Sequence, residues 1–242
     1  MHNLRAVGFV SGAFLAVTTH ALTPPPEAGG IELFANTLVT PSDPGTVIEA
    51  HGWWDDPGMS AGDRWLMGAA LYDMQADEAG WVWVETIKRA VPPPVPPARW
   101  EDGEIDGPIV RGIAAGQSDF GPSVPGDRDN PYFLWRGRWE TSDFTPRVVE
   151  FATTKHLRFA VSGQGPETDL VATGAFQGGR IAIVVRTDCL ADLDGNGELD
   201  LFDFVAFQNF FMDASPVADL DADGDLTIFD FLVFQNAFDA GC

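Results

Sequence analysis

From residue 30 to residue 185, the chain alternates short apolar runs with clusters of Pro, Gly and Asp. The runs are rich in β-branched and aromatic residues, a pattern typical of strands separated by turns. The predicted strands cover residues 31–38, 46–53, 65–75, 81–88, 132–140, 147–153, 157–162, 170–176 and 180–185. Eight or nine short strands without a clear amphipathic helix predict a mainly β domain, an antiparallel β-sandwich.

Two segments refine this prediction. In the strand that starts at Trp81, strict alternation would place Trp81, Trp83 and Glu85 on one face of the sheet. Residues 91–97 read Val-Pro-Pro-Pro-Val-Pro-Pro and cannot form a central strand, because proline has no N–H to donate. They begin a Gly/Pro-rich stretch that reaches about Pro131, and we expect the strands to resume only at Tyr132.

Beyond residue 188 the apolar spacing becomes helical and the chain repeats itself. A shift of 27 residues aligns Ala191–Phe211 with Ala218–Phe238, and 13 of these 21 pairs are identical. Such a dense match indicates a duplication. In each copy an acidic loop precedes a helix with a broad apolar face, formed by Phe202, Phe204, Val205, Phe207 and Phe211 and repeated as Phe229, Phe234 and Phe238.

The spacing of oxygen-bearing side chains in each loop fits a calcium site. Carboxylates or amides fall at loop positions 1, 3 and 5, Gly197 or Gly224 makes the sharp turn at position 6, and an Asp closes the loop at position 12. Calcium prefers six to eight such oxygens. Position 7 would offer its carbonyl, and position 9 its side chain directly or through water. The predicted ligands of two calcium ions are Asp192, Asp194, Asn196, Glu198, Asp200 and Asp203, and Asp219, Asp221, Asp223, Asp225, Thr227 and Asp230. The alternative is a pair of solvated acidic turns.

The loop-then-helix order, without a full entering helix, resembles a dockerin domain over residues 188–242. The helices Phe-Asp-Phe-Val-Ala-Phe-Gln-Asn and Phe-Asp-Phe-Leu-Val-Phe-Gln-Asn, with the final Gly241-Cys242, look like the GC-type dockerins of secreted planctomycete proteins. The resemblance implies a small α-helical domain that docks onto a cohesin-like module. Dockerins usually carry small or hydroxylated recognition residues at loop positions 10 and 11. This chain has Leu201, Phe202, Ile228 and Phe229 there, which predicts an apolar, duplicated partner-binding face.

The net charge and the two cysteines add information on possible partners and on how residues 188–242 are stabilised. The net charge of −22 argues against binding to nucleic acid or anionic membranes. Residues 188–242 contain 13 acidic residues and no Lys or Arg, so two calcium ions would reduce their charge from −13 to −9. The only cysteines, Cys189 and Cys242, bracket the duplication. We predict a disulfide between them, because a unit this small buries little surface; two free thiols are the alternative.

The N-terminus predicts export. An apolar run over residues 6–17 precedes Thr19-His20-Ala21, which reads as a signal peptide cleaved near Ala21. A buried N-terminal helix is the alternative. The run is too short to span a membrane comfortably, and the sequence has no second one. The predicted organisation is therefore a signal peptide (1–21), a β-sandwich domain (22–187) and a dockerin-like domain (188–242) in a secreted or cell-surface protein.

The sequence says less about what the sandwich does. Trp53-Trp54, followed by two aspartates, could stack on a polysaccharide, although core packing is the simpler interpretation. His51 and His156 lie far apart, and no nucleophile elbow or phosphate loop is found, so no catalytic residue is assigned. We expect a non-catalytic module. The alternative is a secreted glycoside hydrolase carried by a dockerin, since many acidic residues could supply a catalytic pair.

Overall fold

The computed structural model describes residues 26–55, 66–86, 101–116, 130–162 and 167–241 of the chain. The predicted signal peptide and the proline run at residues 91–97 lie outside these residues, and both stay predictions. Among the described helices, none is long and apolar enough to cross a membrane.

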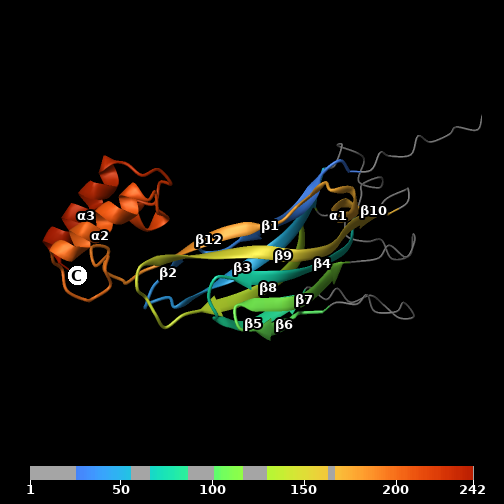
Figure 1. Ribbon diagram of the computed structural model, residues 1–242, viewed down its shortest axis with the longest axis horizontal. Helices are drawn as coiled ribbons and strands as arrows, with labels where there is room; N and C mark the ends of the chain where they lie inside the picture. Colours follow the sequence, from blue (N-terminus) through green and yellow to red (C-terminus); the bar gives the residue numbers. More distant parts are fainter. Residues whose placement is uncertain (1–25, 56–65, 87–100, 117–129, 163–166, 242) are drawn as a thin grey trace, which may run out of the picture.

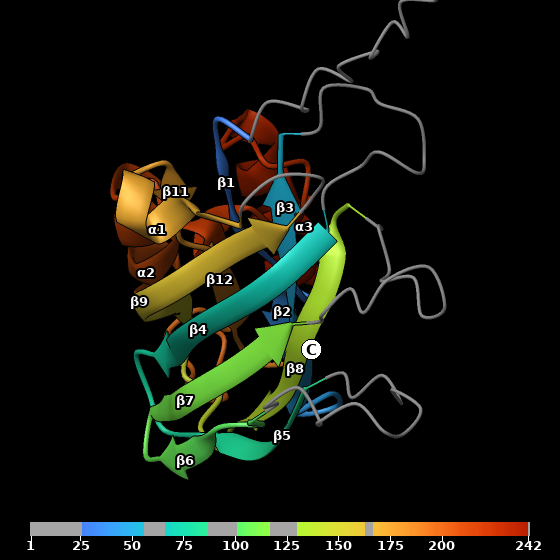
Figure 2. The ribbon, with the colours of Figure 1, turned by 90° about the vertical axis from the view of Figure 1, so that its right-hand side faces the viewer.

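Two sheets pack face to face over residues 29–185 (Figures 1 and 2). The first sheet has the strand order β11-β1-β3-β8-β5, and the second has the order β2-β12-β9-β4-β7-β6, with β10 paired to β9. The strands are β1 Gly29–Phe34, β2 Leu38–Val39, β3 Gly45–Trp54, β4 Leu66–Ala76, β5 Trp81–Thr86, β6 Glu104–Asp106, β7 Ile109–Gly116, β8 Tyr132–Glu140, β9 Arg147–Ser162, β10 Thr168–Asp169, β11 Phe176–Gln177 and β12 Arg180–Val185. Most neighbours are antiparallel; β1 with β11 and β2 with β12 are parallel. The predicted mainly β, two-sheet domain is confirmed.

Aromatic residues fill the space between the sheets. Along β3, every second residue from Thr46 to Trp54 is buried, which is the alternation expected of a strand with one face in the core. Trp139 and Phe151 come from opposite sheets and meet edge to face, with ring centroids 5.6 Å apart. Trp81 contacts Phe151 at the same separation. Burying a side chain of this size stabilises the fold by about 1.5–3 kcal/mol before packing geometry is counted.

The structure corrects the predicted strand list in four places. The predicted strand 31–38 is divided into β1 and β2, with residues 35–37 between them. The Gly/Pro-rich stretch contains the hairpin of β6 and β7, whose Val110 and Ile113 are buried. Its Asp106-Gly107 turn, with Gly107 at φ +58°, was the local signal for a hairpin. Residues 147–162 form one long strand rather than two. Residues 170–176 were predicted as a strand, but Leu170–Thr173 form the short helix α1.

Local capping explains α1. The side chain of Asp169 accepts hydrogen bonds from the N–H groups of Val171 and Ala172, at 3.1 and 3.4 Å. Gly174 ends the helix in the left-handed region, at φ +77°. Capping at both ends outweighs the β-preference of a short Leu-Val-Ala-Thr run.

The predicted alternation along β5 is also wrong. The register of β5 on β8 shifts between Trp81 and Trp83, which marks a bulge. As a result Trp81 lies in the core at 7% exposure, whereas Trp83 is exposed at 37%. One inserted residue changes which face every following side chain occupies.

Beyond β12, the chain forms a second small unit, which we call the loop–helix unit (residues 188–242, described to 241). It contains helix α2 (Leu201–Met212), the 3-10 turn η1 (Pro216–Ala218) and helix α3 (Ile228–Ala240). Figure 1 shows α2 and α3 at one end of the sandwich. This unit has its own apolar core, in which Phe207 and Phe234 stack with ring centroids 5.1 Å apart.

Candidate metal centre and apolar helix face

Each acidic loop is tied to the start of the helix that follows it. Asp200 is the N-cap of α2, and its side chain accepts the N–H of Phe202 at 2.7 Å. Thr227 does the same for α3 with the N–H of Phe229 at 3.1 Å. Loop position 9, predicted as a metal ligand, is therefore used for capping in both copies. This is a structural role that the sequence analysis missed.

The aspartate at position 12 holds the loop together from inside. Asp203 and Asp230 are fully buried. One oxygen of Asp203 accepts the N–H groups of Leu193 and Asp194, at 2.9 and 3.3 Å, and the other accepts the N–H of Asp200 at 2.9 Å. Asp230 makes the equivalent three bonds in the second loop. A carboxylate oxygen has two acceptor positions, so Oδ1 of Asp203 is fully used, whereas Oδ2 keeps one position that could face a cation.

Backbone donors also orient the carboxylates at positions 1 and 3. The N–H of Gly197 donates to Oδ2 of Asp192 at 3.3 Å, and that of Asn196 donates to Asp194 at 3.1 Å. The second loop repeats the pattern with Gly224 on Asp219. Gly197 has φ +84°, in the left-handed region that glycine adopts without a steric penalty. The loop backbone thus aims one oxygen of each first aspartate inward.

Those inward oxygens are the observation that best fits a cation site. Oδ1 of Asp192 and Oδ1 of Asp219 are buried, and neither has a hydrogen-bond partner among the described residues. A buried carboxylate oxygen without a partner is costly, because it loses its hydration and gains nothing in return. Both atoms occupy position 1 of their loops, so the same orphan recurs in two independent copies.

The remaining acidic groups converge on the same two points. Ligand atoms of Asp192, Asp194 and Asp203 lie within 4.8 Å of one another, and so do those of Asp219, Asp221 and Asp223. At the second point, desolvation and the negative charges of neighbouring aspartates raise the pKa of Asp221, against the N–H of Asp223, which lowers it. Clustered carboxylate oxygens of this kind fit a hard cation such as calcium.

The structure does not treat all the predicted ligands alike. The capping residues Asp200 and Thr227 have been described, and Asp230 is not among the clustered carboxylates of the second loop. The clustered carboxylates have been given above. Asn196 is directed at its own loop, since its Oδ1 accepts the N–H of Glu198 at 2.6 Å and its amide donates to Asp194. The side chains of Glu198 and Asp225 are exposed, which agrees with a role for their carbonyls only. Metal binding by any of these residues stays a prediction.

The predicted partner-binding residues are exposed in both copies. The exposed fractions are 71% for Leu201, 66% for Phe202, 63% for Ile228 and 61% for Phe229. Val205 was expected on the broad apolar face of α2 but is exposed, whereas Phe204 from the same predicted face packs into the core of the unit. The helices therefore divide their aromatic residues between an internal core and an outer face.

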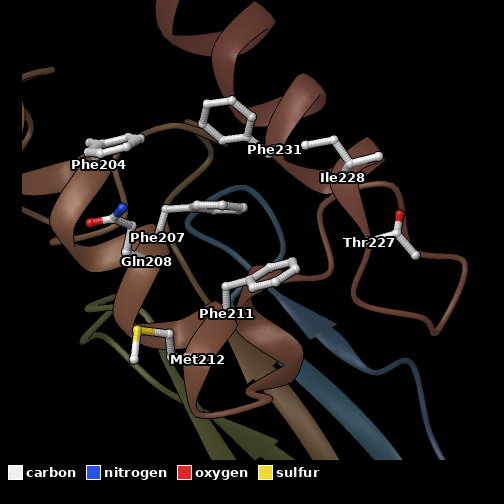
Figure 3. A pocket seen from close by; sticks show the side chains of 8 residues that line it. All are labelled: Phe204, Phe207, Gln208, Phe211, Met212, Thr227, Ile228 and Phe231. Atoms are coloured by element: carbon white, nitrogen blue, oxygen red, sulfur yellow. The ribbon is translucent and has the colours of Figure 1, made fainter.

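The two helices also enclose a pair of apolar grooves, which the sequence analysis did not find. One has a volume of about 460 Å³ and is lined by Phe204, Phe207, Gln208, Phe211, Met212, Thr227, Ile228 and Phe231 (Figure 3). The other, of about 270 Å³, is lined by Asp200, Leu201, Phe204, Phe231, Phe234, Gln235 and Phe238. The 27-residue shift that relates the repeats converts every lining residue of the second groove into one of the first. The repeat in the sequence is thus a twofold relation in space.

The ends of the loop–helix unit meet, as the predicted disulfide requires. Cys189 and Gly241 line one cavity, together with Ala237. No described cysteine is a free thiol. Because Cys242 lies outside the described residues, its pairing with Cys189 stays a prediction.

The candidate residues of the sandwich do not converge on one site. Trp54 is buried in the core, whereas Trp53 is half-buried on the outer face of its sheet. His51 packs between the rings of Phe34 and Phe133, each 5.0 Å away. His156 belongs to the other sheet and bonds to Thr153 at 2.8 Å. Stacking of Trp53 on a glycan therefore stays a prediction, and Trp54 cannot take part.

No protein-family model matches the chain, and no curated protein matches it. A cohesin module from a family 33 glycoside hydrolase of Clostridium perfringens aligns with 66% of this chain and 98% of its own length, at 11% identity and a TM-score of 0.38. A chain of a type I cohesin–dockerin complex from Clostridium thermocellum aligns with 64% of this chain and 99% of its own length, at 12% identity and a TM-score of 0.35. Likenesses this weak define neither the fold nor the function of this chain.

Proposed function

We propose that this is a secreted, non-catalytic protein in which a calcium-loaded, dockerin-like unit attaches a β-sandwich to a cohesin-like protein partner. The observation that carries the proposal is the pair of orphaned carboxylate oxygens, on Asp192 and Asp219. They occupy equivalent positions in two loops whose other carboxylates converge beside them. One calcium ion in each loop would satisfy the orphaned oxygen of that loop and offset the mutual repulsion of its carboxylates.

The docking part of the proposal rests on the exposed, duplicated helix face. Leu201 and Phe202 at the start of α2, with Ile228 and Phe229 at the start of α3, expose large apolar side chains directly beside the loops. Soluble proteins seldom leave such surface uncovered without a use. Because the loops set the first turn of each helix through the capping bonds, calcium would order the docking residues. The glycoside hydrolase alternative has no observation in its favour among the described residues.

Calcium titration calorimetry on the full chain tests the metal sites. We expect two ions to bind the wild-type protein and one ion to bind each of the variants Asp192→Asn and Asp219→Asn, since each variant weakens one position 1. Asp239→Asn is the matched control, because this exposed aspartate lies on α3 outside both loops. Equal stoichiometry in all four proteins would contradict the assignment.

Docking is tested separately with purified cohesin modules, in calcium and in chelator. The double variant Leu201→Asp with Ile228→Asp should keep its two calcium ions and its helices, yet lose any calcium-dependent binding that the wild type shows. Leu157→Asp is the control, since Leu157 is exposed at 75% on the sandwich. Binding that survives with both helix positions charged would place docking on another face.

A further inference from the structure

The loop–helix unit is joined to the sandwich without a linker. Strand β12 ends at Val185, and only residues 186–191 separate it from the first loop ligand, Asp192. This connection is itself held down. The N–H of Arg186 donates to the carbonyl of Val39 at 3.1 Å, and the hydroxyl of Ser42 donates to Asp188 at 2.7 Å. Hydrogen bonds from Ser42 and Thr40 lower the pKa of Asp188.

The apolar cores of the two units are also in contact. Val148 and Val184 are cross-strand neighbours on β9 and β12. Their own neighbours Val149, Ile183 and Val185 are buried in the sandwich, so Val148 and Val184 point to the opposite face of the sheet. There they pack against the core of the loop–helix unit, which includes Val217 and Ala218 of η1, both fully buried.

Loop 1 touches the sandwich at its position 4. A Cβ on Gly195 would lie 2.9 Å from Cδ of Pro146 and 3.3 Å from Cα of Thr145, in the turn before β9. The equivalent residue of loop 2 is Ala222, which has nearly the same backbone angle, with φ +61° against +73°. Ala222 is exposed. The loop conformation therefore tolerates alanine at this position, and the close contact with Pro146 explains why loop 1 carries glycine.

Loop 2 contacts the sandwich through the segment before it. The turn η1 contacts both β9 and β12, and the next residue is Asp219, the first predicted ligand of loop 2. Burial lowers the pKa of the Arg186 guanidinium, and the negative charge of Asp219 opposes that effect.

From these contacts we propose that calcium binding locks the loop–helix unit against the end of the sandwich. Metal then fixes the direction of the docking face relative to the sandwich and stabilises the sandwich itself. This inference rests on the calcium sites of the proposed function but not on docking. Without metal, the repelling carboxylates of both loops loosen Gly195 from Pro146 and η1 from β9 and β12. With metal, both loops present a single rigid surface to the sandwich.

The positions of the tryptophans allow a direct test on the full chain. All eight tryptophans lie between residues 53 and 139, and residues 188–242 contain neither Trp nor Tyr. Tryptophan fluorescence therefore reports unfolding of the sandwich alone. At a calcium concentration about a hundredfold above Kd, we expect the midpoint of this transition to rise by about 5–10 °C relative to chelator. An unchanged midpoint in a protein that binds two ions would overturn the inference and leave the proposed metal sites standing.

Gly195→Ala separates the contact from the metal site. The variant should still bind two calcium ions, because Ala222 occupies the same conformation in loop 2, but its added Cβ collides with Pro146. We expect the calcium-induced shift of the tryptophan signal to fall by at least half. Ala222→Gly is the matched control and should keep the full shift. A full shift in Gly195→Ala would overturn the inference.

A second variant tests the same coupling without any change in the loops, so that misfolding of loop 1 cannot explain the result. Val184→Thr conserves shape, changes no residue of either loop and faces away from the sandwich core. It should also reduce the calcium-induced shift while two ions still bind. A full shift in Val184→Thr, like a full shift in Gly195→Ala, would show that the two units are not coupled through this junction. Failure of calcium to bind the wild type would overturn the proposed metal sites together with this inference.

Discussion

The sandwich and the loop–helix unit are stabilised by different means. The sandwich buries Trp135, Trp139, Phe151 and Phe159 completely between two sheets. Some of its charges form ion pairs, for example Arg147 with Glu78 at 2.7 Å. The loop–helix unit has a core built mainly from facing phenylalanines, and its 13 acidic residues have no Lys or Arg within the unit. The comparison leads us to expect that the sandwich folds on apolar burial, whereas the loop–helix unit depends on calcium to offset its own charge and on a disulfide to hold its ends together.

Removing calcium should produce the largest difference in stability between the loop–helix unit and the sandwich. With two sites each at about a hundredfold above Kd, metal contributes about 5 kcal/mol to the loop–helix unit. We therefore expect chelator to abolish most of the far-UV circular dichroism of α2 and α3. The strands of the sandwich should persist, because their stability comes from apolar burial. Helical signal that is the same in calcium and in chelator would contradict the comparison.

Loss of the predicted disulfide should be the next largest effect. In Cys189→Ser, the closed loop of the unit is opened, which costs about 4 kcal/mol on the chain-entropy model. We expect calcium affinity to fall, because the unfolded unit competes with the metal-bound form. Peptide mapping under non-reducing conditions checks the premise. Two free thiols in exported protein would show that the unit is not closed covalently.

Removing one core ring tests the phenylalanine stack directly. Phe207 is 4% exposed and contacts the rings of Phe231 and Phe234. Phe207→Ala should destabilise the loop–helix unit by about 3–5 kcal/mol. Phe202→Ala is the control on the same helix, since Phe202 is 66% exposed. It should leave the calcium-loaded unit as stable as the wild type, and weaken docking instead. Equal destabilisation by both variants would show that the outer face belongs to the core.

The loop–helix unit and the sandwich also differ in how much of their structure could be predicted from the sequence. The loops and helices of residues 188–241 were predicted closely because two copies constrain each other and position-specific oxygens leave few alternatives. In the sandwich, β8 and β12 were found at their observed bounds. The bulge after Trp81 was missed because cross-strand register depends on a strand distant in sequence. The helix at Leu170 was missed although its caps, Asp169 and Gly174, are local, because the β-preference of the short run was given more weight than the capping signals.

The site was predictable only where local spacing determined it. Position 9 was assigned to the metal, since nothing in the sequence distinguishes a ligand from an N-cap when both need an oxygen at the start of a helix. The grooves between α2 and α3 and the contact of Gly195 with Pro146 arise from how separate segments pack. No spacing in a single sequence encodes those contacts.

The smallest expected effect concerns pH and the sandwich. His156 is half-buried, packs on the ring of Phe176 and bonds to Thr153. Burial lowers the pKa of His156 below its usual value of about 6.5, and the contact with Thr153 opposes this only in part. The unfolded chain therefore takes up the proton more readily than the folded one. The contribution of His156 to stability is present above about pH 6.5 and is lost as the pH falls from there through its folded-state pKa.

In excess calcium, the midpoint of thermal unfolding reported by tryptophan fluorescence should decrease between about pH 6.5 and pH 5. His156→Gln, which cannot become charged, should reduce this slope, whereas His51→Gln should keep the part that His156 contributes. An identical slope in wild type and His156→Gln would show that the folded sandwich accommodates the protonated ring without a penalty.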